Sequence, residues 1–294
     1  MIEQAIVPVA GLGTRLLPIS RAVPKELLPI GPKPALQWIA EELVAAGIRR
    51  IILVASPAKR NIDQLFRRDE ELETRLKEQG KLDLLGTLWS QGPYRDTEIM
   101  VAMQDEQLGL GHAILCGAPM LKPEPFLVAL GDCLMAPVGN SSITRRLIET
   151  SNKRAEIAGA IAFEAVPEHA VSRYGIASPA DSEDVFRLND VVEKPSIENA
   201  PSNLAIAARY VLSHEIVSTL QNIPNGHGGE IQLTDAIRKE IASGRHYVGI
   251  RFQGAEHRID VGNYDSFAKA FIEQALTMDP ALKQTIESFL KVQG

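Results

Sequence analysis

The stretch from Ile2 to Lys33 decides how the chain is read. It consists of an apolar run and two motifs rich in Gly and Pro: IEQAIVPV at 2–9, AGLGTRLLP at 10–18 and VPKELLPIGPK at 23–33. A buried strand that stops at small residues lets the backbone approach a ligand closely, and Arg15 places a cation at its edge. Between residues 10 and 34 one Glu faces four cations, which are Arg15, Arg21, Lys25 and Lys33. A locally positive, glycine-lined strand end on a chain of net charge -6 indicates a polyphosphate site.

This stretch differs from both common phosphate-binding fingerprints. It has no GxxxxGK[ST], and Gly11-Leu12-Gly13 is not followed by the glycine that GxGxxG requires. The alternative is a plain tight turn after a strand, with Arg15 and Lys25 as solvated surface charges. Other parts of the chain have to decide between the two interpretations.

Composition is that of an ordinary globular protein. The 294 residues, 45% hydrophobic and 23% charged, suit one large domain or one domain with an extension. A pI near 5.6 argues against a nucleic-acid partner, although not against a nucleotide. Two cysteines without CxxC or Cys/His clusters argue against disulfides and zinc. With no apolar run of about 20 residues and an acidic N-terminus unlike a signal peptide, we expect a cytoplasmic protein without a membrane partner.

Apolar runs alternate with amphipathic stretches along the chain. Strand, helix, strand in that order predicts an α/β fold: a Rossmann-like mixed, mostly parallel sheet flanked by helices, with a helical C-terminal extension. The expected strands are 2–9, 51–55, 98–103, 126–130, 157–165, 185–193 and 205–212. The expected helices are one from Pro34 that ends at Gly47, then 112–121, 213–221, 231–242, 264–277 and 281–291. The charged segment 58–90 reads as helical, without a strand.

Two aspartates lie at the ends of predicted elements and could bind a metal ion. Asp132 comes directly after the strand FLVAL, so it should face the same crevice as the 10–15 loop. One carboxylate plus substrate phosphates is a common way to hold Mg²⁺. The alternative is an Asp that starts a turn. Asp260 precedes a helix, and the capping interpretation yields to a metal role only if Asp260 lies near Asp132.

Two further segments carry polar groups suited to a nucleotide and a sugar phosphate. Gln104 offers a donor and an acceptor to a base edge, and Gly109 lets backbone groups reach the base plane. Glu193 and Lys194 end a strand, and Pro195 is expected to keep Lys194 extended. Such a pair would place a carboxylate on sugar hydroxyls and an ammonium on a phosphate, unless it is simply solvated. Residues that could line the same pocket are Tyr174 and Gly175.

The sequence contains no evident nucleophile. GxSxG is absent, and neither a paired-carboxylate signature nor a Cys with a probable His partner is recognisable. Phosphoryl chemistry fits this absence, because it proceeds by positioning and charge stabilisation without a covalent protein intermediate.

Taken together, these motifs closely resemble the bacterial UTP–glucose-1-phosphate uridylyltransferases (UDP-glucose pyrophosphorylases) of the sugar nucleotidyltransferase family. They occur in the family's order from about residue 2 to 275. The matching segments are AGLGTRLLP, VPKELLP, the insertion around EELETRL, Gln104 followed by GLGHA, VVEKP, APSNLAIAARYVL and GEIQLTDAI. RIDVGN stands where the family more often has a form like HDCGN, and GPKP where it usually has VDKP.

The resemblance implies a site for UTP and glucose 1-phosphate, with UDP-glucose as product. The nucleotide would bind Ala10, Gly11, Gly13, Thr14, Gln104 and Gly109. Arg15, Lys25 and Lys194 would be the catalytic cations, and Asp132 and Asp260 would hold Mg²⁺. The sugar phosphate would bind Tyr174, Gly175, Glu193 and Lys194.

The resemblance also implies an organisation for the chain. Residues 1–262 would form the catalytic domain, with a nucleotide half at about 1–135 and a sugar-phosphate half at about 136–262. Residues 263–294 would be a helical extension rather than an independent domain, in a homodimer or homotetramer. The rival interpretations are a non-catalytic regulatory paralogue, a pyrophosphorylase for another NTP or sugar 1-phosphate, and a glycosyltransferase, although Asp132-Cys133-Leu134 is no DxD motif.

Overall fold

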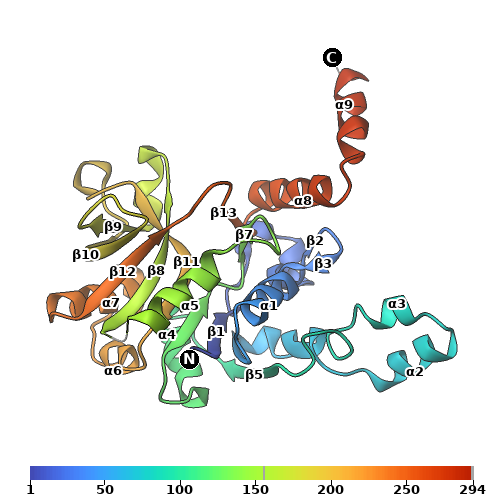
Figure 1. The fold of residues 1–294 in the computed structure, drawn as a ribbon, viewed down its shortest axis with the longest axis horizontal. Coiled ribbons are helices and arrows are strands. Elements are labelled where there is room, and N and C mark those ends of the chain that lie inside the picture. The colour runs from blue at the N-terminus through green and yellow to red at the C-terminus, as the bar shows by residue number, and fades with distance from the viewer. Residues whose placement is uncertain (155, 293–294) are drawn as a thin grey trace.

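The computed structural model describes residues 1–154 and 156–292, without the side chains of residues 227 and 289–292. Within this part of the chain the main element is a nine-stranded sheet (Figure 1). Its strands, in spatial order, are β5 (Glu98–Met103), β4 (Arg50–Ala55), β1 (Gln4–Pro8), β6 (Phe126–Ala129), β11 (Leu204–Leu212), β8 (Ile157–Ala165), β12 (His246–Arg251), β10 (Val185–Glu193) and β9 (Gly175–Pro179).

Helices and two small ribbons complete the described fold. The ribbons are β2 (Pro29–Ile30) with β3 (Lys33–Pro34), and β7 (Cys133–Ala136) with β13 (His257–Asp260). The helices are α1 (Ala35–Ala45), α2 (Glu70–Glu78), α3 (Leu82–Leu85), α4 (Leu110–Gly117), α5 (Ile143–Lys153), α6 (Ile216–Gln221), α7 (Leu233–Ala242), α8 (Tyr264–Met278) and α9 (Leu282–Val292).

The mixed α/β architecture with C-terminal helices is confirmed, but the sheet is not mostly parallel throughout. The first four strands in spatial order, β5 to β6, are mutually parallel. Beyond them, β11 runs against β6, β8 and β9, and β10 runs against β12 and β9. Only β8 and β12 are parallel neighbours in that half. The prediction failed there because β11 lies between β6 and β8 in the opposite direction, and because β9 and β10 form an antiparallel pair that the sequence pattern did not show.

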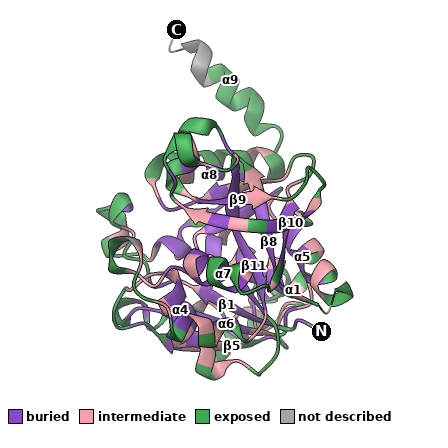
Figure 2. Ribbon diagram, turned by 90° about the vertical axis from the view of Figure 1, so that its left-hand side faces the viewer, coloured by how far each residue is buried: buried purple, intermediate pink, exposed green. Residues whose placement is uncertain are grey.

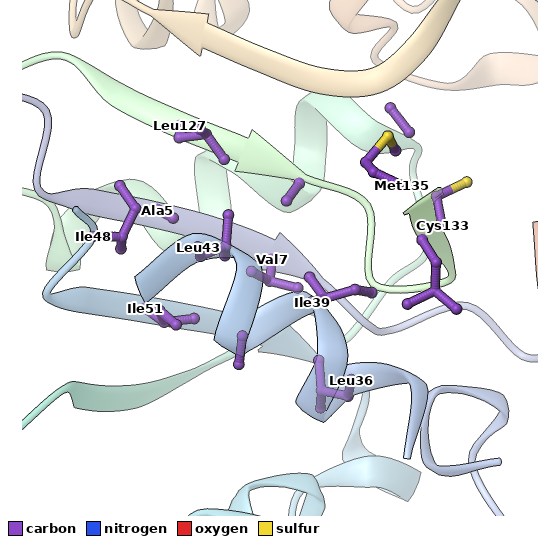
Figure 3. Close-up of a cluster of buried hydrophobic side chains, with 14 of the residues drawn as sticks. Ala5, Val7, Leu36, Ile39, Leu43, Ile48, Ile51, Leu127, Cys133 and Met135 are labelled. Carbon is purple, nitrogen blue, oxygen red and sulfur yellow. The ribbon is translucent and has the colours of Figure 1, made fainter. Parts of the chain in front are cut away.

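One face of the parallel half is covered by α1. Its buried side chains Leu36, Ile39 and Leu43 are at most 1% exposed and pack with Val7 and Leu127 (Figure 3). Burying each such side chain stabilises the fold by about 1.5–3 kcal/mol relative to leaving it exposed. The predicted helix is confirmed, and its packing holds the carboxyl ends of the parallel strands in a fixed arrangement.

Two parts of the chain extend from the central sheet. The helices α2 and α3 extend to one side of the sheet (Figure 1). The helix α9 lies clear of the rest (Figures 1 and 2). The preceding helix, α8, packs against β13 and β2. No helix in the described ranges is long and apolar enough to cross a membrane.

Candidate functional site

Three of the predicted elements meet at the carboxyl ends of neighbouring parallel strands. The 9–14 loop follows β1, Gln104 follows β5 directly, and Asp132 lies three residues after β6. They line a cavity of about 300 Å³, here called the nucleotide cavity. This name, and that of the sugar cavity below, follow only the ligands that the sequence resemblance implies for these residues. Six predicted residues line it, namely Ala10, Gly11, Lys25, Gln104, Gly109 and Asp132. The expectation that Asp132 faces the same crevice as the first loop is confirmed.

A second cavity of about 250 Å³, here called the sugar cavity, adjoins the first through Asp132. The predicted residues Tyr174, Gly175, Glu193 and Asp260 line it. Gly175 pairs with Glu193 across β9 and β10. A Cβ on Gly175 would lie 2.8 Å from Ile206 Cδ1 and 3.3 Å from Glu193 Oε2. A side chain at this position would therefore press against the wall of the cavity.

Lys25 and Asp132 form an ion pair where the two cavities meet. Burial alone would lower the pKa of Lys25, but the charge and hydrogen bond of Asp132, with Glu26 and Asp260, raise it above its ordinary value. Lys25 therefore carries a positive charge throughout the neutral pH range. This charge lies against the first loop, because a Cβ on Gly11 would be 3.5 Å from Lys25 Nζ.

The remaining members of the first loop lie outside the cavity wall. Gly13, Thr14 and Arg15 are not among the residues that line it, and the last two are exposed. A Cβ on Gly262 would lie 3.1 Å from Arg15 Nη2, so the guanidinium reaches toward the two aspartates. Arg15 has no ion-pair partner among the described residues, so its positive charge is free to interact with an anionic ligand.

The two predicted metal-binding aspartates are close neighbours. A Cβ placed on Gly262 would lie 2.6 Å from Asp260 Oδ1 and 3.6 Å from Asp132 Oδ2, so both carboxylates flank this glycine. Asp260 Oδ1 accepts a hydrogen bond from the Gly262 N–H at 2.5 Å. No group of three or more His, Cys, Asp or Glu residues suited to a metal occurs within the described ranges. Two carboxylates completed by phosphate oxygens and water fit Mg²⁺, which seldom takes an all-protein cage.

The backbone at Lys194 contradicts one prediction. Instead of the extended conformation expected before Pro195, Lys194 has φ 45°, in the left-handed region. The chain bends after β10 because the Lys194 N–H donates to the Tyr174 carbonyl at 3.0 Å. As a result Lys194 Nζ lies 3.6 Å from Glu193 Oε1, on the same side rather than the opposite one. Lys194 lines neither cavity, although its neighbour Glu193 lines the sugar cavity.

Hydrogen bonds fix the orientation of the Gln104 amide. Its Nε2 donates to the Gly109 carbonyl at 3.3 Å and lies 3.1 Å from His112 Nδ1. Because a carbonyl only accepts, the NH₂ group is turned to that side and Oε1 is left as an acceptor. Gln104 is 4% exposed, so this acceptor is held firmly in the cavity wall.

Sequence reasoning missed several residues of the site. Arg258 lies over the Tyr174 ring at 4.2 Å and lines the sugar cavity, as do Arg173 and Thr234. Lys59 lies behind the first loop and binds two of its carbonyls. Lys59 follows β4, whose carboxyl end is at the same edge of the sheet, and that position was the available signal. The sequence reading instead assigned it to a charged helical insertion.

A buried cation beside two carboxylates, where two cavities meet, suits the transfer of a nucleotidyl group from one bound molecule to another. A family model described as "Nucleotidyl transferase" matches residues 4–275. The chain belongs to this family.

Within the family, the chain is similar to proteins named for one activity. It is 42% identical to the UTP–glucose-1-phosphate uridylyltransferase 1 of Staphylococcus saprophyticus, over 99% of this chain and 98% of that protein. A UTP-bound UGPase from Acinetobacter baumannii has a TM-score of 0.87 and 36% identity, covering 97% of this chain and 99% of that one. A UDP-glucose pyrophosphorylase in complex with UDP-glucose has a TM-score of 0.79 and 31% identity, covering 95% and 100%.

Proposed function

We propose that the protein makes UDP-glucose and pyrophosphate from UTP and glucose 1-phosphate. Full-length similarity at about 40% identity to uridylyltransferases supports the substrates. The single observation that carries the chemistry is the Lys25–Asp132 pair, which lies where the two cavities meet. A phosphate in the sugar cavity and one in the nucleotide cavity would meet at that point.

In the proposed reaction a phosphate oxygen of glucose 1-phosphate attacks the α-phosphorus of UTP in line, and the bond to the β-phosphate oxygen breaks. The main obstacle is charge, because two unit charges about 4 Å apart repel by about 4 kcal/mol at an effective dielectric near 20. Lys25 and Arg15 would offset this repulsion and stabilise the transition-state charge. Bound Mg²⁺, held by Asp132 and Asp260, would supply further charge neutralisation.

We assign the remaining roles by position. Ala10, Gly11, Gly13 and Thr14 would surround the triphosphate, in a nucleotide half of about 1–135. Gln104 Oε1 would accept the N3–H of uracil, a position where cytosine has an acceptor instead, and Gly109 would lie against the base. In a sugar-phosphate half of about 136–262, Tyr174, Gly175 and Glu193 would bind the hexose. The helices of 263–294 would extend this one domain, in a homodimer or homotetramer.

Pyrophosphate release tests the proposal and its rivals together. We expect release from UTP with glucose 1-phosphate, and at least about hundredfold lower kcat/KM with CTP, because a buried acceptor would face another acceptor. A regulatory paralogue would release none with any NTP, and a glycosyltransferase would consume UDP-glucose instead. If the same assay showed a preference for dTTP or for another sugar 1-phosphate, the assigned substrates would be wrong, but the type of reaction would stand.

Lys194→Ala is expected to weaken the use of glucose 1-phosphate. Its ammonium is beside Glu193, which lines the sugar cavity, on strained backbone, which is often found at functional sites. Losing one charge-assisted hydrogen bond to phosphate should raise the KM for glucose 1-phosphate about ten- to hundredfold, with a smaller change for UTP. Steady-state kinetics with each substrate varied in turn would measure this. Lys239→Ala, on the exposed side of α7, is the control, and an unchanged KM for glucose 1-phosphate in Lys194→Ala would reject the role.

A further inference from the structure

The first loop is held from behind by a buried ion pair. Lys59 Nζ donates to the carbonyls of Val9 at 2.9 Å and Gly11 at 2.6 Å. It also binds both carboxylate oxygens of Glu26, at 2.9 and 2.8 Å. Lys59 is 9% exposed and Glu26 is 1% exposed, so little water competes for these bonds. The loop is thereby attached to the interior rather than left to adjust freely.

The bonds to Lys59 fix which way the loop's peptide groups point. Carbonyls 9 and 11 are bound to Lys59, and Gln107 Nε2 donates to the Ala10 carbonyl at 2.9 Å. In contrast, the N–H groups of residues 10–13 have no hydrogen-bond partner in the ranges that the structure describes. In a trans peptide the C=O and the next N–H point in opposite directions. Carbonyls turned toward Lys59 therefore direct the N–H groups of Ala10 and Leu12 away from it.

Successive free N–H groups on a short turn form a concave site for an anion. We propose that Lys59, fixed by Glu26, is a positioning residue that turns the N–H groups of Ala10 and Leu12 toward the phosphates of the nucleoside triphosphate. This inference rests on the proposed function and deepens it. Lys59 acts through the loop and touches no substrate, whereas Lys25, one residue before Glu26, would meet the phosphates directly.

Burial works against the charges of the pair. Burial raises the pKa of the Glu26 carboxyl and lowers the pKa of the Lys59 ammonium, each in spite of its partner. A buried ion pair adds little stability compared with apolar residues of similar size. The pair instead orients the peptide groups of the loop. An apolar side chain in place of Lys59 would leave the carbonyls of residues 9 and 11 free to turn toward the phosphates.

The variant Lys59→Met tests the proposal when its affinity is measured for ligands that differ only in their number of phosphates. Equilibrium affinities for uridine, UMP and UTP would be measured for the full-length protein in EDTA, with thermal melting as a check of folding. We expect unchanged uridine binding, and about ten- to hundredfold weaker UTP binding, the scale of a lost charge-assisted network. The double variant Lys59→Met/Glu26→Gln removes the unpaired buried carboxylate and should show the same loss for UTP. Lys33→Met is the matched control, because Lys33 binds Glu41 and does not touch the loop.

Each outcome separates the positioning role from its alternatives. Normal UTP affinity in both Lys59 variants would overturn it, while the proposed function would still hold if the wild-type protein makes UDP-glucose. Equal losses for uridine and UTP would show that Lys59 merely maintains the cavity, and would also overturn it. A wild-type protein that binds no UTP would reject the proposed function itself.

Discussion

Asp132→Asn is expected to lower kcat for UDP-glucose formation on the order of 10²- to 10³-fold, as when a principal charge-stabilising contact is lost. Asp132 lines both cavities, pairs with Lys25 and lies close to Asp260. The amide keeps the size of the side chain but removes the charge that would attract Mg²⁺. The variant should therefore also need a higher Mg²⁺ concentration for half of its maximal rate.

Two comparisons separate a metal role from the anchoring of Lys25. Lys25→Met should reduce kcat without raising the Mg²⁺ concentration needed for half of the maximal rate, because it leaves both carboxylates in place and removes a cation that competes for Asp132. Asp265→Asn, an exposed position near Asp260 that lines neither cavity, should leave both measurements unchanged. If Asp132→Asn lost activity but kept the wild-type Mg²⁺ titration, Asp132 would serve only to hold Lys25.

The parallel half of the sheet was predictable because its strands are buried on both faces. Runs such as IILVA at 51–55 and FLVAL at 126–130 are continuously apolar and bounded by Gly or polar residues. The strands β7, β9, β12 and β13 and the helix α5 were not predicted. GIASP, in β9, contains Gly and Pro, and β7 and β13 pair with each other outside the main sheet. The pairing of β7 with β13 joins residues more than 100 positions apart, such as Cys133 with Asp260, and local patterns do not reveal it.

Sequence reasoning placed Gln104 and Asp132 correctly but missed Lys59, Arg173, Thr234 and Arg258. Asp132 and Gln104 could be placed because parallel strands end at one edge of the sheet. The proximity of Asp260 to Asp132 depends on the pairing of β7 with β13 and could not be derived. Lys194 was misjudged because a local rule on residues before Pro was outweighed by its backbone bond to Tyr174. The pairing of Lys59 with Glu26 links distant segments and has no local signature.

Arg209→Met is expected to reduce the free energy of unfolding by about 3–5 kcal/mol, the cost of leaving a buried partner charge uncompensated. Arg209 is fully buried in β11. Its Nε and Nη2 each donate to Glu42 at 2.9 Å, and Nη2 also donates to the Cys133 carbonyl at 3.0 Å. The bond to Cys133 anchors the residue next to Asp132, so turnover should fall as well. Urea titration followed by circular dichroism would measure the change in stability.

The source of the loss can be identified with a double-mutant cycle. If the unpaired Glu42 carboxylate causes most of it, Arg209→Met/Glu42→Gln should be clearly less destabilised than the sum of the single variants. Arg75→Met is the control, since Arg75 pairs with Glu71 on the surface and should change stability by about 0.5 kcal/mol or less. Additive losses in the cycle would mean that packing, rather than charge, makes Arg209 important. The carbonyl bond to Cys133 would then be the contact to examine, because it links β11 directly to the loop that presents Asp132.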